Sequence, residues 1–187
     1  MATPTTKEIV LITGGNTGLG FEIAEALLLL NRFHIIIGFR DATKGAAAAQ
    51  KLHNLNFTDC STIPLDITSL SLLPHFSLRN HKTKIWQTRH PSRKRRKWPA
   101  YAASQAALNM IMLVYYHQYP KMKINACAPG FRATALNNFG QGGSFAPGKI
   151  EDGAKNAVRL SLLGRDGESG TCTEMDDQTG EVRVVPW

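Results

Sequence analysis

The chain has 187 residues, of which 43% are hydrophobic and 8% aromatic. This balance is typical of a globular protein, and we expect a single domain over residues 1–187. Apolar stretches stay well below the roughly 18 residues that span a bilayer, and residues 1–7 lack the apolar core of a secretory leader. A cytoplasmic protein is therefore expected. The three cysteines, Cys60, Cys127 and Cys172, lie too far apart to indicate a zinc site, and their odd number does not suggest a disulfide framework.

The net charge of +8 comes from one segment. Nine of the 22 Lys and Arg residues lie between Arg79 and Lys97, where there is no Asp or Glu, and the rest of the chain has 13 basic against 14 acidic residues. The run Arg93–Lys97 resembles a nuclear-localisation or nucleic-acid patch, but no aromatic stacking pattern or helix-turn-helix signature accompanies it. We therefore expect an atypical basic segment over residues 69–99 and no nucleic-acid partner.

The first third of the chain alternates apolar strands with helices. Buried parallel strands are predicted at residues 8–13, 33–38 and 61–65. Helical spacing of apolar residues predicts helices at 19–30 and 42–55, the second capped by Asp41. This strand-helix alternation predicts an α/β fold with a parallel sheet.

The helical pattern resumes at Tyr101. Helices are predicted at 102–117 and 151–163, and short strands at 122–126 and 170–173, with a turn at Pro129-Gly130. Between residues 69 and 100 the only strand candidate is Lys84–Thr88.

A glycine-rich loop, Thr13–Gly20 (TGGNTGLG), follows the first predicted strand. Gly14 permits a sharp turn, Gly18 lets the backbone approach a pyrophosphate, and Gly20 lets the next helix pack closely. The spacing and the position between strand and helix indicate a dinucleotide site.

Here the sequence resembles the short-chain dehydrogenase/reductase family, whose fingerprint is TGxxxGxG, and its carbonyl-reductase-like members most. Further motifs follow in order: an acid after the third strand (Asp66), an active-site helix of the form YxxSK-A-A-L-N (Tyr101–Asn109), and PGxxxT (Pro129–Thr134). The resemblance covers residues 7–68 and 100–187. It implies a doubly wound Rossmann-type sheet and an oxidoreductase that moves hydride between a nicotinamide cofactor and a small-molecule carbonyl or secondary alcohol.

The resemblance also implies a set of cofactor-binding residues. In the family, the acid lies against the adenine, and PGxxxT meets the nicotinamide carboxamide. Carried over to this sequence, the set is Gly14, Asn16, Gly18, Leu19, Gly20, Arg40, Asp66, Tyr101, Gln105 and Thr134.

Cofactor choice is read at the end of the second strand, where an NAD-selective site has a carboxylate and an NADP-selective site a basic group. Phe39 occupies the carboxylate position, and Arg40 can pair with a 2′-phosphate through its planar guanidinium. This favours NADP over NAD. The alternative is that Arg40 is a solvated surface residue.

The catalytic residues that the resemblance implies are only partly present. Tyr101 stands at the proton-transfer position, but Gln105 replaces the lysine that lowers the tyrosine pKa, and the nearest hydroxyl at the serine offset is Thr88. An isolated tyrosine titrates near pKa 10, so about one in a thousand is ionised at pH 7. The proton relay is therefore expected to be poor.

A segment of the family's sheet is also missing. The Asn-Asn-Ala-Gly motif is absent, and Tyr101 follows Asp66 by only 35 positions, in the interval where the family places its fourth and fifth strands. The comparison with the family therefore predicts a chain truncated between the third strand and the active-site helix, with central strands of the sheet lacking. An impaired or inactive relic that at most binds the dinucleotide is the alternative function. Helices like 102–117 and 151–163 pair across two-fold axes in the family, so the resemblance implies a homo-oligomer. The substrate stays open.

Overall fold

The computed structural model describes residues 7–65, 99–140 and 146–186. They belong to two compact units, Met1–Ile85 and Trp86–Trp187, which are described separately below. Asp66, Thr88, the strand candidate at 84–88 and nearly all of the basic segment 69–99 lie outside the described residues. The single-domain organisation stays a prediction.

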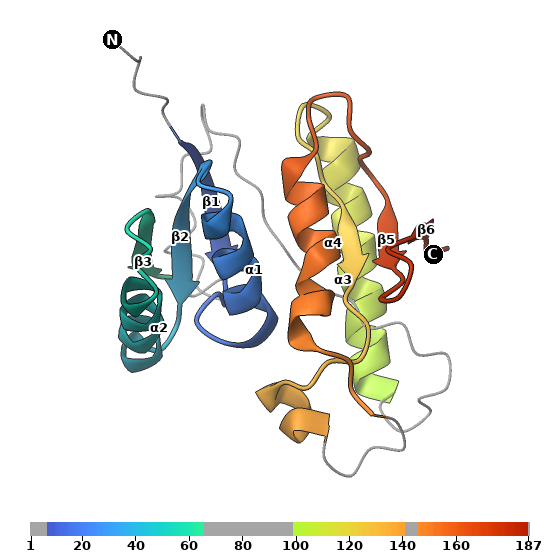
Figure 1. Cartoon of the computed structure of the whole chain (residues 1–187). Coiled ribbons are helices and arrows are strands. Elements are labelled where there is room, and N and C mark those ends of the chain that lie inside the picture. Colours follow the sequence, from blue (N-terminus) through green and yellow to red (C-terminus); the bar gives the residue numbers. More distant parts are fainter. Residues whose placement is uncertain (1–6, 66–98, 141–145, 187) are drawn as a thin grey trace. The chain divides into compact units, whose positions relative to one another are not determined.

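The first unit is a parallel three-stranded sheet in the order β1-β2-β3, with two helices in its crossovers (Figure 1). The predicted elements of this part are confirmed within two residues at each end. Their bounds are β1 Glu8–Thr13, α1 Gly18–Leu29, β2 Phe33–Phe39, α2 Ala42–Asn54 and β3 Cys60–Pro64.

The core of the first unit lies between the helices and the central strand. Ile35 and Ile37 of β2 are fully buried, as are Leu27 of α1 and Leu52 of α2. Burying such a side chain contributes about 1.5–3 kcal/mol. Because apolar residues recur at the helical period in α1, one side of that helix covers the sheet.

The second unit has a smaller sheet in which β4 and β5 are parallel and β6 is antiparallel to β5 (Figure 1). Its elements are α3 Pro99–Gln118, β4 Ala126–Ala128, the 3₁₀ helix η1 Ala135–Gly140, α4 Ile150–Leu162, β5 Cys172–Met175 and β6 Val182–Val184. Helix α3 begins earlier than predicted, at Pro99, because proline is well tolerated in a first helical turn, where its missing N–H is not needed.

The strand predicted at 122–126 is wrong in position, since β4 begins where that prediction ended. The preceding residues bond to side chains and loop carbonyls instead of a strand: the Ile124 amide donates to Ser169 Oγ (3.1 Å), and Asn125 Nδ2 donates to the Glu168 carbonyl (3.0 Å). Strand β6 was not predicted, because its three residues are exposed and follow a polar turn.

The two faces of the β4–β5 pair contact different helices. Ala126 stands opposite Cys172 and packs with Met112 of α3. Thr173, one residue further along β5, hydrogen-bonds to Asn156 of α4. Side chains alternate along a strand, so Cys172 faces α3 while Cys127, opposite Thr173, lies on the α4 side.

The α/β class and the Rossmann-type parallel strands are confirmed. In the sheet orders, β1 and β4 are both end strands, and among the described residues no strand pairs with both of them. This agrees with the predicted loss of central strands. None of the described helices is long and apolar enough to cross a membrane.

Candidate functional site

The glycine loop of the first unit turns sharply at the end of β1. The Gly14 amide donates to the Gly38 carbonyl of β2 (3.0 Å), which anchors the turn to the neighbouring strand. Gly14 (φ +67°) and Gly18 (φ +60°) adopt left-handed backbone conformations that glycine favours. A β-carbon at Gly14 would meet no atom within 4 Å, so the space beside the turn is open.

Gly20 allows α1 to lie directly against this loop. A β-carbon at Gly20 would stand 2.7 Å from the Gly14 carbonyl oxygen and 3.0 Å from the Gly15 Cα. Both neighbours are backbone atoms, so a side chain at Gly20 would push the helix away from the turn. The predicted roles of Gly14 and Gly20 in the turn therefore have a direct geometric basis.

The first turn of α1 has no side-chain cap. Its N-cap residue, Thr17, makes no capping hydrogen bond, and the turn contains no acidic residue. Helix α2 differs, because the Asp41 carboxylate accepts from the amides of Thr43 (3.0 Å) and Lys44 (3.2 Å), as predicted. The α1 terminus is thus the one of these two whose N–H groups are left for an anion.

The end of β2 separates a buried ring from an exposed cation. Phe39 is buried, and its ring lies against Gly45 of α2, whereas Arg40 is exposed. Lys44 lies one helical turn further on, with its Nζ 3.9 Å from Asp41 Oδ2. No role was predicted for Lys44 from the sequence, although a basic residue in the helical turn after Arg40 can indicate a phosphate site.

Tyr101 and Gln105 lie one turn apart near the start of α3 in the second unit. Tyr101 is 39% exposed, and partial burial raises the pKa of its phenol above the ordinary value. The phenol is therefore protonated at neutral pH. Gln105 is half-buried and offers an amide in place of a charge.

The Pro129–Thr134 loop follows β4 and contains a buried arginine. Arg132 is 6% exposed, and its Nε donates to the Pro129 carbonyl. Its two terminal nitrogens donate to the Asp177 carboxylate at 2.7 and 2.6 Å. Thr134 is half-buried, and its carbonyl accepts from the Phe139 amide (2.8 Å). Arg132 lies inside the PGxxxT motif, at a position for which no role was predicted.

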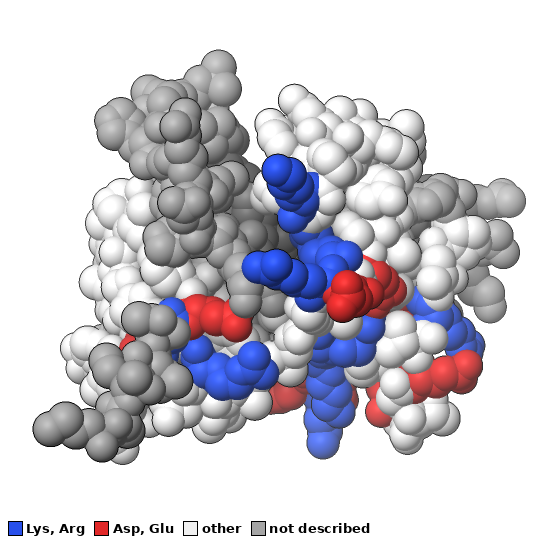
Figure 2. Space-filling model, turned by 90° about the horizontal axis from the view of Figure 1, so that it is seen from above, with Lys and Arg blue, Asp and Glu red and all other residues white. Residues whose placement is uncertain are grey.

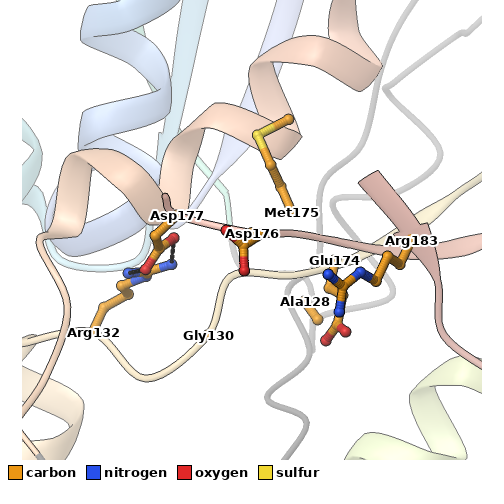
Figure 3. A pocket seen from close by; sticks show the side chains of 8 residues that line it. All are labelled: Ala128, Gly130, Arg132, Glu174, Met175, Asp176, Asp177 and Arg183. Carbon is orange, nitrogen blue, oxygen red and sulfur yellow. Dashed lines mark hydrogen bonds and ion pairs between the residues drawn. The ribbon is translucent and has the colours of Figure 1, made fainter. Parts of the chain in front are cut away.

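A pocket of about 240 Å³ opens at the carboxyl ends of β4 and β5, beside this loop (Figure 3). Charged side chains of both signs line it, and Figure 3 shows the Arg132–Asp177 pair on one side of it. The lining residues are Ala128, Gly130, Arg132, Glu174, Met175, Asp176, Asp177 and Arg183. The carboxyl ends of parallel strands are where ligands bind in α/β folds.

The predicted site residues thus form two groups. Gly14, Asn16, Gly18, Leu19 and Gly20 share one loop and helix start in the first unit, with Arg40 at the end of the adjacent strand. Tyr101, Gln105 and Thr134 belong to the second unit. Asp66 and Thr88 lie outside the described residues.

The residues of the first unit fit a dinucleotide. The open space at Gly14, the close helix at Gly20 and the uncapped α1 terminus together could hold a diphosphate. These strands, crossovers and glycine turn define a Rossmann-type α/β protein.

Comparison with known proteins assigns the family. None of the protein-family models compared matches this chain. The short-chain dehydrogenase/reductase ATR10 of Stachybotrys chlorohalonatus is 32% identical over 260 aligned residues, which include 97% of this chain and 94% of that protein. The chain belongs to the short-chain dehydrogenase/reductase family of oxidoreductases. Because 187 residues cannot fill 260 aligned positions, ATR10 has sequence with no counterpart here.

Other relatives agree with this assignment. Salutaridine reductase of Papaver somniferum is 39% identical over 87 residues, which include 44% of this chain and 27% of that protein. The structure of that enzyme superposes with a TM-score of 0.69 at 17% identity, covering 89% of this chain and 99% of that one. The NADP complex of RhlG from Pseudomonas aeruginosa gives 0.72 at 18% identity, covering 96% of this chain and 100% of that one. The structural matches show the same fold.

Proposed function

We propose that this chain binds NADP in preference to NAD and acts on a small-molecule carbonyl or secondary alcohol. The observation that carries this proposal is the combination of the open glycine turn, the uncapped α1 terminus and the exposed Arg40. The NADP complex of RhlG and the NADPH-dependent reductase YwfH have the same fold, which supports the choice of cofactor.

The residues of the first unit would bind the adenosine half. Gly14, Gly18 and Gly20 let the backbone and the α1 dipole approach the diphosphate. The guanidinium of Arg40 pairs with the 2′-phosphate, and the exposed Lys44 ammonium adds a second positive charge. Phe39 occupies the position where an NAD-selective site has a carboxylate for the ribose 2′-hydroxyl, and its side chain is buried.

The residues of the second unit would contact the substrate and the nicotinamide half of the cofactor. When bound, the cofactor supplies the hydride that the protein itself lacks. Tyr101 donates its phenolic proton to the substrate oxygen, Gln105 hydrogen-bonds the ribose, and Thr134 contacts the carboxamide. The Tyr101 phenol is protonated at neutral pH and can donate to a carbonyl oxygen, but its raised pKa makes it a weaker acid than an ordinary tyrosine.

A second candidate function is dinucleotide binding with little or no catalysis. Gln105 provides no positive charge to stabilise a tyrosinate, and burial raises the Tyr101 pKa further. Both observations slow the proton transfer while leaving the glycine turn intact. Binding and turnover therefore have to be measured separately.

The test is the affinity of the purified chain for NADPH and NADH, followed by nicotinamide fluorescence. The wild-type chain should bind NADPH more tightly than NADH. In Arg40→Gln the affinity for NADPH should fall by about tenfold, the scale of one charge-assisted hydrogen bond, and the affinity for NADH should change little. Arg32→Gln is the matched control, because Arg32 is an exposed arginine just before the same strand begins. Equal affinities for the two cofactors, or an Arg40 variant without effect on NADPH, would refute NADP selectivity.

The oligomeric state and location are also proposals. Helix α3 exposes Met110, Ile111, Val114 and Tyr115, which gives the expected homo-oligomer an apolar face. The small residues of α4, in contrast, are buried. On the face shown in Figure 2, basic and acidic side chains are mostly intermixed. The cytoplasmic location and the lack of a nucleic-acid partner stay predictions.

A further inference from the structure

Arg132 joins three separate segments of the second unit. It belongs to the loop after β4, it forms an isolated bridge with Gly148 just before α4, and it pairs with Asp177 in the turn between β5 and β6. The Gly148 amide also donates to the Phe131 carbonyl (2.9 Å). The loop is therefore tied to the Gly148 segment through backbone contacts and to the Asp177 turn through the buried Arg132 side chain.

Two glycines leave the space that the guanidinium fills. Gly130 has a left-handed backbone (φ +76°), and a β-carbon there would stand 3.0 Å from Arg132 Nη2. A β-carbon at Gly148 would overlap Arg132 Nη1. With its Nε bonded to the Pro129 carbonyl, the guanidinium has little freedom to move within the loop.

The turn that presents Asp177 is itself fixed. The Asp176 carboxylate accepts from the amides of Gln178 (2.9 Å) and Thr179 (2.8 Å), and the Asp176 amide donates to the Glu181 carbonyl (2.9 Å). Asp177 is thus held facing Arg132 in a two-bond, parallel arrangement (Figure 3). Such bidentate pairs impose direction as well as attraction.

We propose that Asp177 is a positioning residue, which fixes the Pro129–Thr134 loop through Arg132 so that the loop can hold the nicotinamide half of the cofactor. This inference rests on the proposed dinucleotide function. Asp177 acts at a distance of 45 residues in sequence from the arginine it orients. Lysine could not replace Arg132, because an ammonium lacks the planar pair of donors.

The test compares two ligands that share the adenosine half. NADPH has the nicotinamide, whereas adenosine 2′,5′-bisphosphate lacks it, and calorimetry measures both with the whole chain. In Asp177→Asn and in Arg132→Lys, the Kd for NADPH should rise by about tenfold, the scale of one misplaced hydrogen bond. The Kd for the bisphosphate should stay within about twofold, near the resolution of such measurements. Glu181→Gln is the control. It also removes a carboxylate from this hairpin, but the Glu181 carboxylate pairs with the exposed Arg183 and not with Arg132.

Hydrogen exchange provides a readout that needs no cofactor. The Gly148 amide should exchange faster in Asp177→Asn, while the amides of β2 keep their protection. Unchanged Gly148 exchange or unchanged NADPH affinity would overturn the positioning role, and so would an equal loss for both ligands, which indicates a general fold defect. A wild-type chain that binds neither ligand would overturn the proposed function, and the cofactor role of Asp177 with it.

Discussion

The ring of Phe39 occupies the space where a β-carbon of Gly45 would stand. Phe39 ends β2, and Gly45 lies in the first half of α2, so this contact sets how closely the helix approaches the strand. It also directs the Phe39 ring into the core, which leaves Arg40 as the exposed side chain at this strand end.

Gly45→Ala should therefore destabilise the protein. Alanine is favoured over glycine in a helix by about 1 kcal/mol, but overpacking against a ring costs about 1–3 kcal/mol. The packing term should win, because the ring is stiff and buried. Urea unfolding of Gly45→Ala measures the loss. Ala46→Gly, at an exposed neighbour in the same helix, is the control and should show only the loss of helix propensity.

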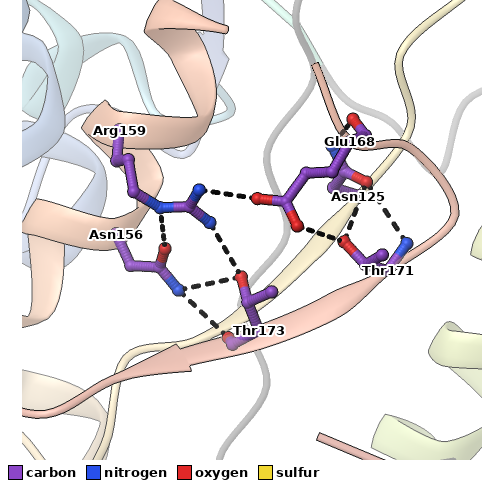
Figure 4. Close-up of polar contacts among 6 residues, drawn as sticks. All are labelled: Asn125, Asn156, Arg159, Glu168, Thr171 and Thr173. Carbon is purple, nitrogen blue, oxygen red and sulfur yellow. Dashed lines mark hydrogen bonds and ion pairs between the residues drawn. The ribbon is translucent and has the colours of Figure 1, made fainter. Parts of the chain in front are cut away.

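Asn156 and Thr173 form the centre of a polar network in the second unit (Figure 4). Asn156 Nδ2 donates to the Thr173 carbonyl and to Oγ1, both at 3.1 Å, and Asn156 Oδ1 accepts from Arg159 Nε (3.0 Å). Arg159 in turn pairs with Glu168 (2.6 Å), which ties α4 to the loop before β5. Asn156 and Thr173 are fully buried.

Asn156→Ala should cost more stability than Thr173→Val. The first change removes the amide donor from the buried Thr173 carbonyl and hydroxyl, at about 1–3 kcal/mol for each buried group left unsatisfied, whereas the second keeps the bond from Asn156 to the Thr173 carbonyl. The double variant should lose less than the sum of the two, by about 0.5–3 kcal/mol. Denaturant unfolding of the four proteins measures this coupling, and strict additivity would contradict the network.

The buried thiol of Cys127 should make the protein less stable at high pH. Burial raises the pKa of this thiol to about 12 from an ordinary value of 9.0. The folded state therefore keeps a proton that the unfolded chain releases, so the contribution is complete below pH 9 and is lost as the pH rises toward 12. In this window the unfolding free energy should fall by up to about 1.4 kcal/mol per pH unit from this group.

Cys127→Ala should flatten that dependence, whereas Cys60→Ala, at a half-buried thiol, should alter it less. The measurement is urea unfolding at a series of alkaline pH values for the three proteins. Cys127 and Cys172 should also stay unlinked under mild oxidation, because they lie toward opposite faces of the β4–β5 pair. Equal pH dependence of the unfolding free energy in wild type and Cys127→Ala would show that burial does not raise the pKa of the Cys127 thiol.

Wild-type turnover should be at least about a hundredfold below that of an intact relative, since positioned acid–base catalysis is worth about 10² to 10⁴ in rate. Gln105→Lys should restore part of it, because a lysine one turn from Tyr101 on α3 would lower the raised pKa of the phenol. NADPH oxidation with a panel of ketones and aldehydes measures the rates. A rise of an order of magnitude would place the defect in the proton relay, and no rise would place it in the predicted loss of central strands. Wild-type turnover equal to that of intact relatives would refute the importance of this position.

Val114→Glu should shift the protein toward monomer. Val114 is 56% exposed, at the centre of the apolar face that Met110 and Ile111 share on α3. A charge there would have to be desolvated on association, which is strongly unfavourable. Light scattering at micromolar protein measures the mass, and Ala46→Glu, exposed on α2, is the control. A wild-type monomer at that concentration would refute self-association through α3.

The sequence by itself determined the elements and motifs whose signals are local. Glu8–Thr13 is strand because its apolar residues are β-branched and end at glycines, and Asp41 caps α2 because a short carboxylate reaches the first free amides. The family followed from ordered motifs of the same local kind, and the short interval before Tyr101 predicted the loss of central strands.

Only the tertiary structure decided features that depend on distant partners. Strand β4 begins only at Ala126, because the two preceding residues hydrogen-bond to Ser169 and Glu168, more than 40 residues away in sequence. The burial of Arg132 depends on Asp177, and nothing in the residues around the arginine indicates that a carboxylate in the last turn of the chain will neutralise it. Local propensity acts over a few residues, whereas packing and ion pairing select among arrangements of the whole unit, which is why these contacts could not be derived from periodicity or motif.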